Sequence, residues 1–253
     1  MAPHFNAASR VHALFEKAVP TQDHISVLNT WKKVFNISIG EAYKERTAVA
    51  TTLGMVAEQL DNVFLQMSLT NYSQDIYQFV INRLHEALSY NALDDSWGGQ
   101  KSKLDPPTLN SLRWLSETIP SEGLRINTED LDLLREQLIA LRNDVLEGTS
   151  SEEAKRFLLQ QIEVLLKAIR EYDIVGNVVF TAAYNTTRTD VTLKRALFEA
   201  SSDDEGFRNA WERFTQCWIW IKDRSEDIQV LLTLYDAAQL ANTAAHHFKL
   251  LPG

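Results

Sequence analysis

Apolar residues recur at alternating spacings of four and three between residues 128 and 172, the clearest pattern in the chain. The repeat comprises Leu134, Leu138, Leu141 and Val145, and then Leu158, Ile162, Leu165, Ile169 and Tyr172. Gly148, Thr149 and Ser150 interrupt it. This spacing places apolar residues on one helix face, and a short connection makes two such helices antiparallel neighbours. We therefore expect a helical hairpin over residues 128–172.

Further stretches with helical spacing cover most of the remaining chain. They span residues 11–18, 25–35, 49–67, 76–88, 109–119, 189–200, 202–224 and 225–248. Thr21 is a candidate N-cap for the second of these, and Asp105 before Pro106 for the fifth. In residues 76–88, we expect four side chains to point inward: Ile76, Val80, Leu84 and Leu88. The pattern predicts an all-α fold, an antiparallel multi-helix bundle of roughly nine to eleven helices.

Residues 174–181 are ambiguous, because β-branched side chains surround Gly176. A strand would suit this composition, but an isolated strand leaves its backbone groups unpaired, so we favour a helix. The composition agrees, since nine glycines and six prolines are few for 253 residues and helix interiors exclude both residue types.

Residues 94–105 break the periodicity with paired aspartates, paired glycines and flanking lysines. We interpret this segment as a mobile loop or linker. It would divide an N-terminal helical subdomain, residues 1–93, from a C-terminal helical subdomain, residues 106–253. The alternative is that both halves share one core.

The net charge of −9 disfavours a general grip on nucleic acid, since an acidic surface repels phosphates. It leaves room for a local basic patch, and the densest basic runs are Lys32-Lys33 and Lys101–Lys103. The single cysteine, Cys217, suits a reducing cytoplasm. No apolar stretch approaches the roughly 20 residues that span a bilayer, and no secretory signal is visible. We therefore expect a cytoplasmic protein without membrane association.

An aromatic stripe at helical spacing near the C-terminus is the most suggestive surface candidate. It comprises Phe207, Trp211, Phe214, Trp218 and Ile221. We expect this stripe to form core, because aromatic side chains bury large areas. Trp220 lies off the stripe, so its exposure would favour an interface there. The interface candidates are Trp218, Trp220 and Tyr235.

Candidate chemistry is sparse. The chain has no P-loop, dinucleotide glycine motif, nucleophile elbow or Cys-x-x-Cys pair. His246 and His247 are neighbours, which point about 100° apart on a helix and do not share a metal ion. Only His85 and Cys217 stand out as reactive side chains by residue type. We expect no metal, no cofactor and no catalytic residue that the sequence identifies.

Three functional hypotheses follow. The first is a helical protein–protein interaction or regulatory module that binds another protein or self-associates, because amphipathic helices offer grooves and faces. The second is a ligand-binding bundle or enzyme whose site is assembled from distant helices, with His85 or Cys217 supplying reactivity. The third, a nucleic-acid binder with a local patch, is disfavoured by the net charge.

Overall fold

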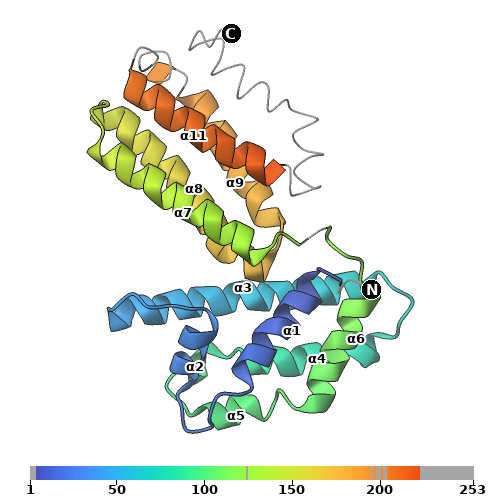
Figure 1. Cartoon of the computed structure of the whole chain (residues 1–253). Helices are drawn as coiled ribbons and strands as arrows, with labels where there is room; N and C mark the ends of the chain where they lie inside the picture. The colour runs from blue at the N-terminus through green and yellow to red at the C-terminus, as the bar shows by residue number, and fades with distance from the viewer. Residues whose placement is uncertain (1–3, 124, 195, 198–200, 202–203, 223–253) are drawn as a thin grey trace. The chain divides into compact units, whose positions relative to one another are not determined.

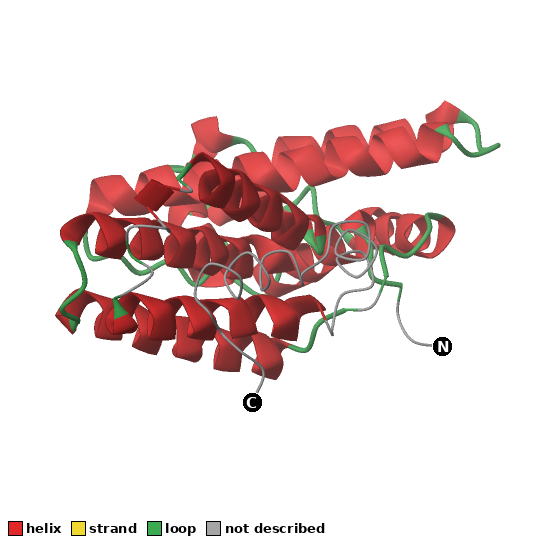
Figure 2. Ribbon diagram, turned by 90° about the horizontal axis from the view of Figure 1, so that it is seen from above, coloured by secondary structure: helices red, strands yellow, loops and turns green. Residues whose placement is uncertain are grey.

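The computed structural model describes residues 4–123, 125–194, 196–197, 201 and 204–222. Within these ranges the chain forms ten α-helices and one short 3-10 helix, and no strand (Figure 2). This confirms the all-α fold. The chain divides into two compact units, unit 1 (Met1–Glu122 and Asp173–Gly176) and unit 2 (Gly123–Tyr172 and Asn177–Gly253). None of the described helices is both long enough and apolar enough to cross a membrane.

Unit 1 is built around a ring of four helices (Figure 1). These are α1 (Ala7–Ala18), α3 (Ala42–Ser68), α4 (Gln74–Ala87) and α6 (Pro106–Thr118). Helix α1 packs on α3 and α6, and α4 also packs on α3 and α6, which closes the ring. Two short helices, α2 (Val27–Val34) and α5 (Trp97–Lys101), contact this ring, and the 3-10 helix η1 covers Tyr90–Ala92. The largest fully buried side chains of the unit include Phe15, Trp31, Leu60, Leu84, Trp97 and Leu112.

The segment that we interpreted as a mobile linker, residues 94–105, is packed on the core of unit 1. It contains α5, whose Trp97 is fully buried with its ring edge-on to Trp31 at a centroid distance of 5.5 Å. Leu104 is buried as well. The two compact units therefore separate after Glu122 rather than at this segment, and the division into residues 1–93 and 106–253 gives way to this boundary.

Reciprocal backbone hydrogen bonds hold this segment in place. Four backbone hydrogen bonds of 2.7–3.0 Å join residues 23–28 to residues 93–98. The N–H groups of Val27 and Leu28 donate to the carbonyls of Asp95 and Leu93, respectively. In the other direction, the N–H groups of Trp97 and Gly98 donate to the carbonyls of Ile25 and Asp23. Ser26 and Ser96 form an antiparallel bridge at the centre. Helix α2 begins at Val27 with Ser26 as its N-cap, which corrects the prediction of Thr21. Each turn thus satisfies the backbone groups of the other, which neither could satisfy alone.

The described part of unit 2 contains four helices that run side by side (Figure 1). They are α7 (Thr128–Glu147), α8 (Glu152–Val175), α9 (Val178–Leu193) and α11 (Glu205–Lys222). Helices α7 and α8 are the expected hairpin, and the residues of its apolar stripes are buried. The aromatic stripe of α11 is also buried, with Trp211 packed against Phe157 of α8 at a ring distance of 6.0 Å. Residues 174–181 are helical except at Gly176, where φ is +83°, and Asn177, the N-cap of α9; α8 gives way to α9 at these two residues.

Candidate functional site

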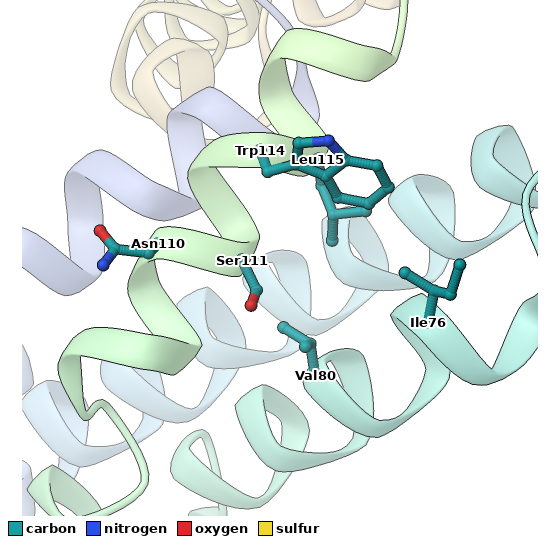
Figure 3. Close-up of a pocket in the computed structure, with 6 residues that line it drawn as sticks. All are labelled: Ile76, Val80, Asn110, Ser111, Trp114 and Leu115. Atoms are coloured by element: carbon teal, nitrogen blue, oxygen red, sulfur yellow. The ribbon is translucent and has the colours of Figure 1, made fainter.

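A groove of about 400 Å³ runs between α4 and α6 on unit 1. It is lined by Ile76, Val80, Asn110, Ser111, Trp114 and Leu115 (Figure 3). Ile76 lies near the start of α4 and Trp114 near the end of α6, so the two helices run in opposite directions along the groove. The groove floor and walls are mostly apolar, and Asn110 and Ser111 are its polar members.

Large apolar side chains are exposed beside this groove. Ile76, which we expected to point inward, is 53% exposed, and Phe79 on the next turn of α4 is 70% exposed. Tyr72, in the turn before α4, is also exposed, and its ring lies edge-on to Trp114 at a centroid distance of 5.1 Å. We call Tyr72, Ile76, Phe79 and Trp114 the groove cluster. Ile76 and Phe79 are three residues apart in α4, so they share one side of the helix.

The core of unit 1 fixes the position of α4. Tyr77 and Leu84 of α4 are buried, and the ring of Tyr77 meets Phe64 of α3 edge-on at 5.4 Å. On the opposite side of the helix, Phe79 therefore faces away from the core. No element in the described part of unit 1 covers Phe79, and the core contacts of α4 hold it at the surface.

Arg83 holds α4 against the start of α6. Its Nε donates to the carbonyl of Lys103 at 3.1 Å, and its Nη2 donates to the carbonyl of Ser102 at 2.8 Å and to Asp105 at 3.0 Å. Asp105 is the N-cap of α6, as predicted, and accepts a hydrogen bond from the backbone N–H of Thr108 at 3.0 Å. Hydrogen bonds from Thr108 and the nearby Arg83 guanidinium lower the pKa of the Asp105 carboxyl. Arg83 thus ties α4, one wall of the groove, to the start of α6, the other wall.

The groove carries no acid–base machinery. None of its six lining residues has an ionisable side chain. The hydroxyl of Ser111 donates to the carbonyl of Pro107, four residues earlier in α6, at 2.9 Å. A serine without a nearby base is a weak nucleophile. The arrangement can bind apolar groups and does not activate a reacting atom.

The two reactive candidates from the sequence lie in different units, and neither lines the groove. His85 of α4 pairs through Nε2 with Asp61 of α3 at 3.1 Å and is partly exposed. Cys217 of α11 is buried, and its Sγ donates to the carbonyl of Arg213 at 3.4 Å. Burial raises the pKa of the Cys217 thiol to about 11. Cys217 is therefore a buried residue of the core of unit 2 whose thiol holds its proton more tightly than usual, unlike the lowered pKa that activates a cysteine nucleophile.

Two of the three predicted interface residues near the C-terminus, Trp218 and Trp220, are described by the structure, and neither is fully exposed. Trp218 is only 5% exposed, and its ring packs edge-on against Tyr184 of α9 at 5.5 Å. It belongs to the core of unit 2, which corrects its assignment as an interface residue. Trp220 is half-buried, and Tyr235 lies outside the described residues. His246 and His247 also lie outside them.

No metal-binding cluster occurs among the described residues, where three or more histidine, cysteine or acidic side chains never gather. Two of the three acidic residues in the paired turns, Asp23 and Asp94, have basic partners. Asp94 receives both Nη atoms of Arg46, at 2.6 and 2.9 Å, and Asp23 receives Lys101 at 2.9 Å. Arg46 accordingly lowers the pKa of Asp94.

The chain matches no protein-family model, no curated protein and no solved structure. Function must therefore be argued from the site itself.

Proposed function

We propose that this chain is a protein–protein interaction module and that the α4–α6 groove, with the groove cluster around it, is its contact surface. The observation that carries the proposal is the exposure of Phe79 and Ile76 beside a groove walled by Trp114. Scattered single apolar residues are ordinary on protein surfaces, but several exposed ones around a groove mark interaction sites. An apolar centre with a polar rim is also the usual anatomy of an interface.

The chemistry of the cluster favours a macromolecular partner. Covering an exposed side chain such as Phe79 contributes roughly 1.5–3 kcal/mol, and aromatic anchors dominate the energy of interfaces. Ile76 and Tyr72 lie beside Phe79 and would be covered by the same contact. The groove is a partly open depression rather than an enclosed cavity, whereas small-molecule sites enclose most of their ligand.

The alternative hypotheses receive less support. A catalytic site in the groove is less favoured, because its lining has no ionisable side chain and neither Cys217 nor His85 belongs to it. Nucleic-acid binding is less favoured at the densest basic runs, because three of their four lysines have acidic partners. Lys32 pairs with Glu45, Lys101 with Asp23 and Lys103 with Glu86. We also propose a cytoplasmic location, supported by a single cysteine that is buried as a thiol.

Photo-crosslinking in the source cells tests this function. A benzophenone-bearing amino acid replaces Phe79 in one version of the full chain and Tyr43 in a second. Tyr43 is the matched control, since it is an exposed aromatic residue of unit 1 (80% exposed) on α3, outside the groove. We expect a discrete crosslinked polypeptide from position 79 and none from position 43. Equal, diffuse labelling from both positions, or none from either, would overturn the proposal.

A further inference from the structure

Unit 1 consists of two halves, each with a long helix, a short helix and a second long helix: α1, α2 and α3 in one half, and α4, α5 and α6 in the other. The four backbone hydrogen bonds between residues 23–28 and 93–98 form two pairs, and exchanging the two segments converts each bond into its mate. Ser26 and Ser96, which bridge at the centre, are the N-caps of α2 and α5 and exchange with each other. An approximate two-fold axis through this bridge therefore relates the two halves.

The cores of the two halves also correspond residue by residue. Between α1 and α4, corresponding residues lie as far apart in the chain as Ser26 and Ser96 do. In this way the buried residues Val11, Leu14 and Ala18 correspond to the buried residues Ile81, Leu84 and Leu88. Between α3 and α6, the buried series Val49, Leu53, Val56 and Leu60 has the same spacing as the buried series Thr108, Leu112, Leu115 and Ile119. Helix α1 packs on α3 as α4 packs on α6, which agrees with this correspondence.

The α4–α6 groove therefore has a counterpart between α1 and α3, where Arg10 takes the place of the groove residue Val80. The last turn of α8, residues 173–176, fills this counterpart. Arg10 donates to Gln59 of α3 at 2.8 Å and to the carbonyl of Ile174 at 2.9 Å. Ile174 is buried in the core of unit 1. Of two equivalent sites, one thus holds the end of a helix, and the other is the groove.

The filled site shows which features of a helix end are bound there. The last four carbonyls of an α-helix have no partner within the helix, and Arg10 donates to one of them. Ile174 and Val175 supply the apolar contact. In the groove the lining is uncharged, and the side-chain amide of Asn110 can donate to such a carbonyl. The groove is therefore suited to a helix end that is apolar and uncharged.

We infer that the α4–α6 groove binds the C-terminal turn of an α-helix of another protein, with branched apolar side chains of the kind that Ile174 and Val175 present to the counterpart. This inference rests on the proposed function, because it names the partner of the same surface. The helix comes from another protein, since the chain's own end of α8 is already bound at Arg10. Its apolar side chains lie between α4 and α6, where they meet Ile76 and Trp114.

Fluorescence polarisation with a labelled, helix-stapled peptide of residues 160–177 tests the inference on the full chain. This peptide reproduces the helix end that the counterpart binds. We expect saturable binding by the wild type. Binding by I76E should be roughly tenfold weaker or worse, because the substitution replaces an apolar contact of the groove by a charge. Y43E is the matched control, since Tyr43 is exposed on α3 outside the groove, and it should bind like the wild type.

A second peptide, with Ile174→Asp and Val175→Asp, should bind the wild type about tenfold more weakly or worse. Circular dichroism melting checks that I76E folds as the wild type does, which the exposed position of Ile76 predicts. No saturable binding of the first peptide, equal binding of both peptides, or equal binding by I76E and Y43E would overturn the inference. Absence of peptide binding together with a crosslinked polypeptide from position 79 would refute the helix end and leave the proposed function standing. Absence of both would refute both.

Discussion

The guanidinium of Arg10 is buried, only 4% exposed, and donates from Nη1 to the carboxylate of Glu122. Its Nε donates to the carbonyl of Ile174 at 2.9 Å, and its Nη2 donates to Gln59 at 2.8 Å. A buried charge is tolerated when it is paired and hydrogen-bonded in this way. One side chain therefore connects α1, α3, the segment that follows α6 and the last turn of α8 within unit 1.

Loss of the Glu122 carboxylate should strongly destabilise unit 1. E122A leaves the Arg10 charge buried without its counter-ion and also removes the acceptor of the Ala7 backbone N–H. We expect a loss of about 3 kcal/mol in the free energy of unfolding, measured by urea denaturation. The control is R213Q, which breaks the half-exposed pair of Arg213 with Asp144 at 2.6 Å and should cost less than about 1 kcal/mol. Equal effects of the two variants would contradict this account.

Gly176 should tolerate no side chain. Its φ is +83°, and a Cβ atom there would lie 2.5 Å from Nη1 of Arg10. G176A should therefore cost about 2 kcal/mol or more in thermal or urea unfolding, from backbone strain and displacement of Arg10. G54A is the matched control. Gly54 lies inside α3 with nothing within 4 Å of an added methyl group, so alanine should stabilise the protein by about 0.5–1 kcal/mol. A neutral G176A would contradict the close approach of Arg10.

Cys217 should resist alkylation in the native protein. Burial raises the pKa of its thiol to about 11, so little thiolate exists near pH 8, and the sulfur is also shielded from solvent. We expect iodoacetamide labelling to be slow in the folded chain and fast in denaturant, as followed by intact mass. Rapid native labelling at pH 8 would contradict the buried position.

The raised pKa of the Cys217 thiol also predicts that the stability of the folded chain depends on pH. The folded-state pKa of Cys217 is raised from 9.0 to about 11, so the folded state holds the proton more tightly than the unfolded state. Its contribution is fully present below pH 9 and is lost as the pH rises towards 11. The stability difference between the wild type and C217A should therefore shrink by about 2–3 kcal/mol over that interval. A difference that is constant with pH would show that the thiol is not desolvated.

The apolar periodicity predicted the helices that bury their apolar stripe against another long helix. The hairpin of α7 and α8 and the aromatic stripe of α11 are examples. It mispredicted residues 21–26 and 94–105, and these two segments include the turns that bind each other through the Ser26–Ser96 bridge. Their structure depends on hydrogen bonds between positions far apart in the sequence, which leave no local apolar repeat. The buried Trp97 beside two glycines was the one local sign of core.

The candidate site was harder to predict for a related reason. Spacing alone does not distinguish a side chain that faces the core from one on the shoulder of the same helix. Ile76 follows the stripe of Val80 and Leu84, yet it lies at the rim of the groove and is largely exposed. Trp218 sits on a stripe whose spacing suits either core or interface, and its burial depends on Tyr184 of α9. The available sequence signal for the site was Phe79, an aromatic residue that lies off the expected inward stripe of Ile76, Val80 and Leu84.

The α4–α6 groove as a contact surface can be tested directly by crosslinking from its two walls. The benzophenone amino acid is placed at position 79 of α4 in one version of the full chain and at position 110 of α6 in another, since both positions are exposed. We predict that peptide mass spectrometry finds the same crosslinked polypeptide from both positions. Different products from the two positions, or no product from either, would contradict a contact surface at the groove.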